Sequence, residues 1–78
     1  MTFSRSGLIK QLEYEGFSKN DATFAVEYLD VNWKKQAVGK AKDYLEYSHF
    51  SRAGLIKQLK YEGFTQSQAE YGAKEAGL

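Results

Sequence analysis

Residues 3–17 read FSRSGLIKQLEYEGF, and residues 50–64 read FSRAGLIKQLKYEGF, which repeats the first block 47 positions later (Phe3 to Phe50). The copies differ only at Ser6/Ala53 and Glu13/Lys60. A match of this length does not arise by chance, so the chain contains an internal duplication. The fold of this chain is therefore decided by what the repeated block forms.

The repeated block carries the signals of one helix with a defined start and end. Ser4 and Ser51 are predicted N-caps, because a serine hydroxyl accepts a hydrogen bond from the free N–H groups of a first helical turn. Leucine and isoleucine recur at helical spacing behind each cap. Gly16 and Gly63 then provide the left-handed residue at which many helices end.

A second helix is predicted directly after each block. Ser18 is the cap in the first copy, and Thr65 with Gln68 forms a capping-box pattern in the second. In the first copy the apolar residues share one face: Ala22, Ala25, Val26 and Leu29. Two helices joined by a short turn that contains glycine are typical of a helix-turn-helix corner.

The segment between the copies, residues 32–49, predicts one connecting helix. Asn32 is a suitable cap, and Trp33 is predicted to anchor this helix against the one before it. The fold class is therefore all-α: tandem helix-turn-helix repeats, with about five short helices in the order a-b-c-a-b. The predicted helices span 4–15, 19–29, 33–47, 51–62 and 66–76. The predicted units are 1–31, the first helix-turn-helix, and 32–78, the connecting helix plus the second. If the natural unit is c-a-b, the first copy lacks its own connecting helix.

The apolar positions shared by both copies are predicted to form the core. Periodicity places Leu8, Leu12 and Phe17 there, together with their partners in the second copy. Replacing Leu12 or Leu59 by alanine is then expected to cost about 2–5 kcal/mol in each case. Three tyrosines are predicted to be half-buried: Tyr14, Tyr61 and Tyr71.

Composition limits the kinds of protein this can be. With 78 residues, no cysteine and one histidine, the chain has a small core, no disulfide and no thiolate metal site. The N-terminal residues have no apolar segment typical of a signal peptide, and no run of about 18 apolar residues predicts a membrane span. The absence of cysteine leaves the compartment open.

The sequence offers no basis for catalysis. The capping serines have no histidine or acid at a spacing that suggests a relay, and Glu13 and Glu15 do not share a helix face. No glycine-rich phosphate loop is present. We therefore predict a protein that is not an enzyme, with no catalytic residues, no cofactor and no metal.

Two longer segments carry a resemblance to a known family. NWKKQAVGKAK (residues 32–42) and YLEYSHFSRAGLIKQLKYEGFTQSQAEYGA (residues 44–73) resemble the host-cell surface-exposed lipoprotein repeat, the Ltp-type repeat of Gram-positive bacteria and their prophages. The resemblance covers nearly the whole chain. It implies a helix-turn-helix fold at the cell surface on a lipid-anchored protein. Some phage-encoded members act in superinfection exclusion, in which they engage the tape-measure protein of an incoming phage and block its DNA from entering.

The resemblance also sets the expected location and partner. We expect the extracellular face of the membrane or the cell surface, with an anchor that is not in this chain, or the cytoplasm if the chain is naturally leaderless. We expect a monomer with a protein partner, and the resemblance indicates the tape-measure protein as that partner. Contact with the membrane is expected only through that anchor.

Two alternative functions remain open at this level. A helix-turn-helix suggests DNA binding, but each second helix is net −1 and contains no arginine, whereas phosphate contacts need several basic residues on one face. No nucleic-acid partner is therefore expected. The other alternative is a structural cell-wall spacer, which the sequence does not exclude.

Charge asymmetry suggests where a protein partner would dock. Residues 3–31 hold three basic and five acidic residues, a net charge of −2, whereas residues 32–49 hold four basic and two acidic residues, a net charge of +2. Fields of this kind steer and orient encounters. The partner-binding hypothesis therefore names Glu15, Asp21 and Glu27, and an ordinary solvated face is the alternative.

Overall fold

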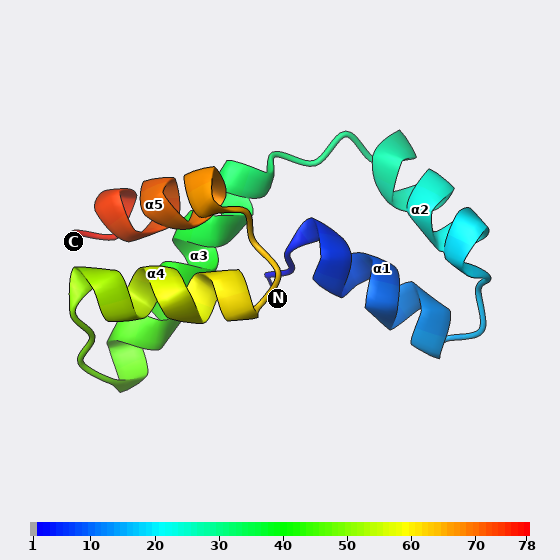
Figure 1. Ribbon diagram of the computed structural model, residues 1–78. Coiled ribbons are helices and arrows are strands. Elements are labelled where there is room, and N and C mark those ends of the chain that lie inside the picture. Colours follow the sequence, from blue (N-terminus) through cyan, green and yellow to red (C-terminus); the bar gives the residue numbers. More distant parts are fainter. Residues whose placement is uncertain (1) are drawn as a thin grey trace.

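Five α-helices follow one another in the computed structural model, which describes residues 2–78 (Figure 1). They are α1 (Arg5–Tyr14), α2 (Lys19–Tyr28), α3 (Trp33–Tyr47), α4 (Arg52–Tyr61) and α5 (Gln66–Glu75). No strand occurs in this part of the chain, so the all-α prediction is confirmed, and each helix end lies within one residue of its predicted position. Met1, with which the first predicted unit begins, lies outside the described residues.

The helices begin and end where the side chains satisfy their free backbone groups. The Ser4 hydroxyl accepts from the Gly7 N–H at 2.9 Å, and the Ser51 hydroxyl accepts from the Gly54 N–H at 3.0 Å. The predicted capping box at Thr65 is present, with both of its hydrogen bonds to Gln68. These caps explain why the repeated sequence starts each helix at the same place.

The α1–α2 turn and the α4–α5 turn have the same geometry. Gly16 and Gly63 each adopt φ of +107°, which a residue with a side chain rarely adopts. In each turn the N–H of the following phenylalanine donates to a leucine carbonyl five residues earlier at 3.1 Å, Phe17 to Leu12 and Phe64 to Leu59. This is the Schellman pattern, and it ends α1 and α4 in the same way.

A three-helix core forms between α3, α4 and α5 (Figure 1). Its buried residues come from all three helices and from the α4–α5 turn: Ala37, Ala41, Leu55, Leu59, Phe64, Ala69 and Ala73. Gly72 allows α5 to approach α3 closely, since a Cβ atom there would lie 2.9 Å from the backbone of Ala37. Small residues therefore set the distance between these two helices.

The first corner, α1 with α2, has a smaller and separate core. Ile9, Ala22 and Val26 are buried in it, and Leu8 and Leu12 are only partly buried. Trp33 packs against this cluster, which confirms its predicted role as an anchor on the preceding helix. Figure 1 shows α1 and α2 lying apart from the bundle of α3, α4 and α5, within a molecule measuring 37 × 20 × 18 Å.

Three hydrogen bonds attach the first corner to the rest of the chain. The Phe3 N–H donates to the Gln36 side chain at 3.1 Å, and the Ser4 hydroxyl donates to the Glu62 carbonyl at 2.7 Å. The Ser6 hydroxyl donates to the Gly63 carbonyl at 3.4 Å. Ser4 is only 2% exposed, so this helix cap is also the contact between the two corners.

Several burial predictions are wrong. Phe17 was predicted as core but is 51% exposed, whereas its partner Phe64 is 3% exposed. Leu29 was predicted to share the buried face of α2, but it too is exposed. Tyr14 and Tyr61 point into solvent rather than lying half-buried. The first corner lacks a covering helix, which accounts for Phe17 and Leu29.

Candidate protein-docking surface

On the second corner, α3 covers a mixed polar and apolar face of α4–α5. The Tyr44 hydroxyl on α3 donates to the carboxylate of Glu62 and accepts from the Gln58 side chain at 3.1 Å. Burial raises the pKa of the Tyr44 hydroxyl, and its hydrogen bond to Glu62 raises it further. Lys34 at the start of α3 lies with its Nζ 5.4 Å from the centre of the Tyr71 ring on α5, a cation–π arrangement. Apolar contacts, one hydroxyl and one cation therefore hold α3 in place.

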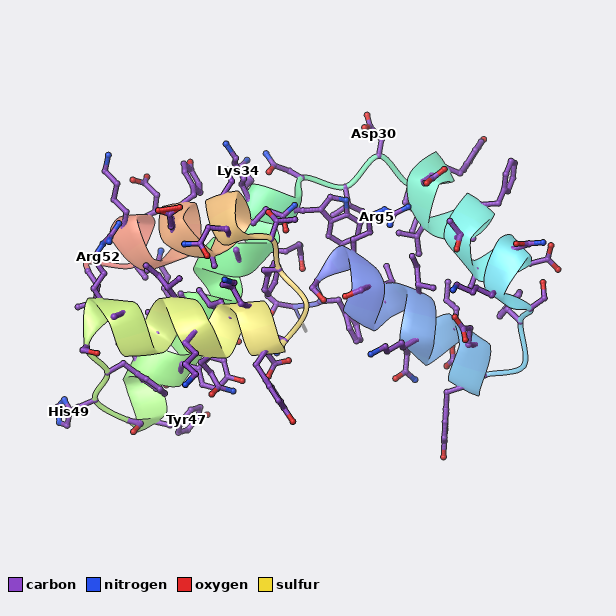
Figure 2. All side chains as sticks on the ribbon, viewed as in Figure 1. Arg5, Asp30, Lys34, Tyr47, His49 and Arg52 are labelled. Carbon is purple, nitrogen blue, oxygen red and sulfur yellow. The ribbon has the colours of Figure 1, made fainter. Side chains whose placement is uncertain are left out.

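Within residues 2–78, no helix lies over the matching face of the first corner. Phe24, at the position that corresponds to Tyr71, is 72% exposed, while Tyr71 is 39% exposed. Leu29 is 59% exposed. Figure 2 shows side chains of α2 extending away from α1 with no other element over them. The α1 and α4 sequences repeat, but within residues 2–78 no helix covers α1–α2 as α3 covers α4–α5.

This open face contains an apolar groove. It has a volume of about 430 Å³, no polar atoms line it, and its walls are Leu12, Phe24, Ala25, Tyr28 and Leu29. Grooves of a few hundred cubic ångströms that apolar side chains line are typical of binding sites. The groove is therefore our main candidate for a docking surface.

The three acidic residues predicted from charge do not form one cluster. Glu15 is the C-cap residue of α1, and Asp21 lies in the first turn of α2, so both flank the α1–α2 turn. Glu27 lies near the other end of α2, where its carboxylate pairs with Arg5 at 2.5 Å (Figure 2). Asp21 and Glu27 are six residues apart, about one and two-thirds helical turns, and therefore project in different directions.

A second kind of groove is repeated on both corners, between the two helices of each. On the first corner it measures about 530 Å³, and on the second about 500 Å³. The first is lined by Arg5, Ser6, Ile9, Lys10, Glu13, Lys19 and Thr23, and the second by the seven residues at matching positions. The arginine and one lysine recur in both grooves, and each groove carries three basic side chains and one acidic side chain, so the two have the same net charge of +2.

Within residues 2–78 no group of three or more histidine or acidic side chains is placed to hold a metal ion. No helix in the same range has both the length and the apolar character needed to cross a membrane.

Sequence reasoning found the charge asymmetry but missed the groove. The signal for it was the element order a-b-c-a-b, which gives the second corner a connecting helix and the first corner none. The junction at Ser4 was also missed, because Ser4 and Ser51 lie in the same local sequence and only one of them meets the other corner.

The fold and these surfaces define a small all-helical protein made of two helix-turn-helix corners. The chain belongs to the family of host cell surface-exposed lipoproteins, whose family model matches residues 1–29 and 32–75. This confirms the family that the repeated block resembles. The description of the family gives a location and a lipid anchor, and it names no reaction. Comparisons with curated proteins and with solved structures find no match.

Proposed function

We propose that this chain is a non-enzymatic protein-binding module displayed at the cell surface. In this proposal it acts in phage superinfection exclusion: it binds a protein of the incoming phage, the tape-measure protein, and blocks the phage DNA from entering the cell. The open apolar groove on α1–α2 is the observation that carries the proposal, because an uncovered apolar face of this kind suits a protein partner. Membership of the surface-exposed lipoprotein family supports the location.

The acidic residues of the first corner are proposed to steer the partner toward this groove. Glu15 and Asp21 are exposed near the α1–α2 turn, and residues 3–31 carry a net charge of −2. A basic partner segment would be attracted to this end of the molecule, mainly through a faster association rate. Glu27 contributes less to the field, because Arg5 offsets its charge.

The test is phage exclusion by a lipid-anchored form of this chain on a sensitive host. We expect phage to adsorb normally while delivery of its DNA falls, and we expect the purified chain to bind the purified tape-measure protein. Reversing Glu15, Asp21 and Glu27 to lysine should leave the helical content unchanged, since the exposed Arg5–Glu27 pair is worth about 0.2–1 kcal/mol. The reversal should slow association, most visibly at low salt.

A matched control makes the same charge change elsewhere. Reversing Asp43, Glu46 and Glu75 to lysine adds equal charge on exposed positions of α3 and α5. If both triple variants exclude phage as well as the parent, the acidic surface is not the docking site. If no surface variant of any kind reduces exclusion, the spacer alternative is favoured. Sub-micromolar, strongly salt-dependent binding to duplex DNA would instead favour the DNA-binding alternative.

A further inference from the structure

We infer that the open face of α1–α2 binds a basic amphipathic helix of a partner protein, in the way that α4–α5 binds α3. The inference rests on the proposed function as a protein-binding module, and it names the class of partner. The second corner shows how a helix occupies this face, and the first corner repeats the part of it that α4 forms, with Gln11, Leu12 and Glu15 at the positions of Gln58, Leu59 and Glu62. The parts formed by α2 and α5 differ in sequence.

The first corner retains the polar groups that hold α3 on the second. On the second corner, Gln58 and Glu62 hydrogen-bond the Tyr44 hydroxyl. The matching residues of the first corner, 47 positions earlier (58 to 11 and 62 to 15), are Gln11 and Glu15. Both are exposed, and none of the side-chain hydrogen bonds within residues 2–78 involves them. An incoming helix with a tyrosine at the position of Tyr44 would find the same donor and acceptor.

The first corner also retains a ring for a cation. Lys34 lies over the Tyr71 ring on the second corner, and Phe24 presents the matching ring on the first, with most of its surface in solvent. The charges of the two segments are complementary, because the segment that contains α3 is net +2 and residues 3–31 are net −2. The partner helix should therefore repeat the spacing of Lys34, Ala37 and Tyr44 in α3. It should have a basic residue three positions before the residue that takes the place of Ala37, and a tyrosine seven positions after that residue.

The helix is expected to come from another protein rather than from a second copy of this chain. Ala37 and Ala41 on α3 are fully buried against α4 and α5. A second copy could offer its α3 only by exposing Leu55, Leu59 and Phe64, whose burial forms its main core. That exchange would lose more apolar contact than it gains, because the first corner offers a smaller core.

The two faces differ in one respect that gives a sharper test. Gly72 lets α3 approach within contact of the α5 backbone, whereas the first corner has Ala25 at the matching position. A Cβ at position 72 would lie 2.9 Å from the Ala37 carbonyl group. The partner helix must therefore lie slightly farther from α2 than α3 lies from α5. Replacing Ala25 by glycine should let an α3-type helix approach more closely.

The experiment uses the full chain and a synthetic peptide of residues 34–49, which contains Tyr44 but lacks Trp33. Trp33 is the one tryptophan of the chain and packs on the first core, so its fluorescence reports binding at this corner. We expect amide NMR shifts on titration to concentrate in α1 and α2. Ala25→Gly should tighten peptide binding severalfold, and Leu29→Glu should weaken it at least about tenfold, the equivalent of about 1.4 kcal/mol.

Matched variants distinguish specific binding of the peptide at the groove from nonspecific binding. Tyr61→Glu, at an exposed position on the other corner, should leave peptide affinity unchanged. A Tyr44→Phe peptide should bind the parent more weakly, but it should bind the Gln11→Ala, Glu15→Ala variant as well as the Tyr44 peptide does, because the hydroxyl then has no partner. Shifts at Leu59 or Phe64 would mean that the peptide replaces α3, and they would overturn the inference. Absence of binding, or a dimer in solution that covers Leu29, would overturn it as well.

Peptide binding and phage exclusion are measured separately, so failure of the helix site can be told apart from failure of the proposed function. If the peptide binds the groove but the anchored parent excludes no phage, the groove is a helix site and the proposed function fails. If the parent excludes phage and Leu29→Glu excludes equally well, the proposed function stands without the groove, and the inference about the partner is wrong.

Discussion

The two corners of this molecule have nearly the same sequence in their first helix and turn, and the same turn geometry, yet they differ in how much they bury. α4–α5 lies under α3, and Leu55, Leu59 and Phe64 of its repeated block are buried. α1–α2 lies under Trp33 alone, so Leu12 remains partly exposed and Phe17 mostly so. The local sequence therefore determines where the helix ends and how the chain turns. The neighbouring element determines whether the same side chain is buried or exposed.

The largest expected difference concerns the matched leucines. Leu59→Ala should cost about 2–5 kcal/mol, because it empties a fully buried site. Leu12→Ala should cost only about 1–2 kcal/mol, because part of that side chain is already in water. Urea unfolding of both variants measures the difference. Equal losses would mean that the first corner is covered in solution, for example by a second copy of the chain.

The matched turn glycines should differ next. Both adopt φ of +107°, so replacing either by alanine strains the backbone by about 1–2 kcal/mol. At Gly63 the new Cβ would also lie 2.1 Å from the Ser6 hydroxyl and 2.6 Å from that of Ser4, whereas at Gly16 it meets nothing within 4 Å. Gly63→Ala should therefore be clearly more destabilising in thermal melts. Adding Ser6→Ala should restore part of the loss at Gly63 and none at Gly16.

The capping serines offer a smaller version of the same comparison. Ser51→Ala removes one cap and should cost about 1 kcal/mol. Ser4→Ala also removes the hydrogen bond to the Glu62 carbonyl across the junction, so it should cost about 1 kcal/mol more. Chemical denaturation of the two variants tests this, and identical costs would show that the junction bond contributes nothing.

The smallest effect is expected where the second helices end. Asp30 has φ of +50°, whereas the matching residue of the second corner is Gly77, with φ of +108°. Asp30→Gly should therefore stabilise the protein by up to about 1 kcal/mol, because glycine adopts the left-handed conformation without the steric cost of a Cβ atom. A raised melting temperature would support this. A lowered one would show that the Asp30 side chain itself stabilises the link.

The helices could be predicted to within one residue because their limits depend on local chemistry. Ser4, Ser51 and Thr65 cap helices through bonds to residues three positions away, and Gly16 and Gly63 end them within one turn. None of these signals needs the rest of the fold. The anchor role of Trp33 was also predictable, from its place at the start of the connecting helix.

Burial and the site were harder to predict, because both depend on which elements meet. Nothing within residues 3–17 indicates that Phe17 lacks the cover that Phe64 has. The net charge of residues 3–31 indicated the first corner as the docking site. The prediction grouped Glu15, Asp21 and Glu27 as one surface, but these residues lie at different ends and sides of that corner. The groove is open because, among the described residues, no helix packs on α1–α2 as α3 packs on α4–α5.

The narrow attachment of the first corner also has a consequence for how the molecule opens. Three hydrogen bonds and the packing of Trp33 connect α1–α2 to the bundle, and the two cores share no buried residue. The first corner can therefore unfold as a cooperative unit of its own while α3, α4 and α5 remain folded. Backbone amides of α1 and α2 should then exchange their hydrogens with solvent faster than those of α4 and α5, although α1 and α4 have nearly the same sequence.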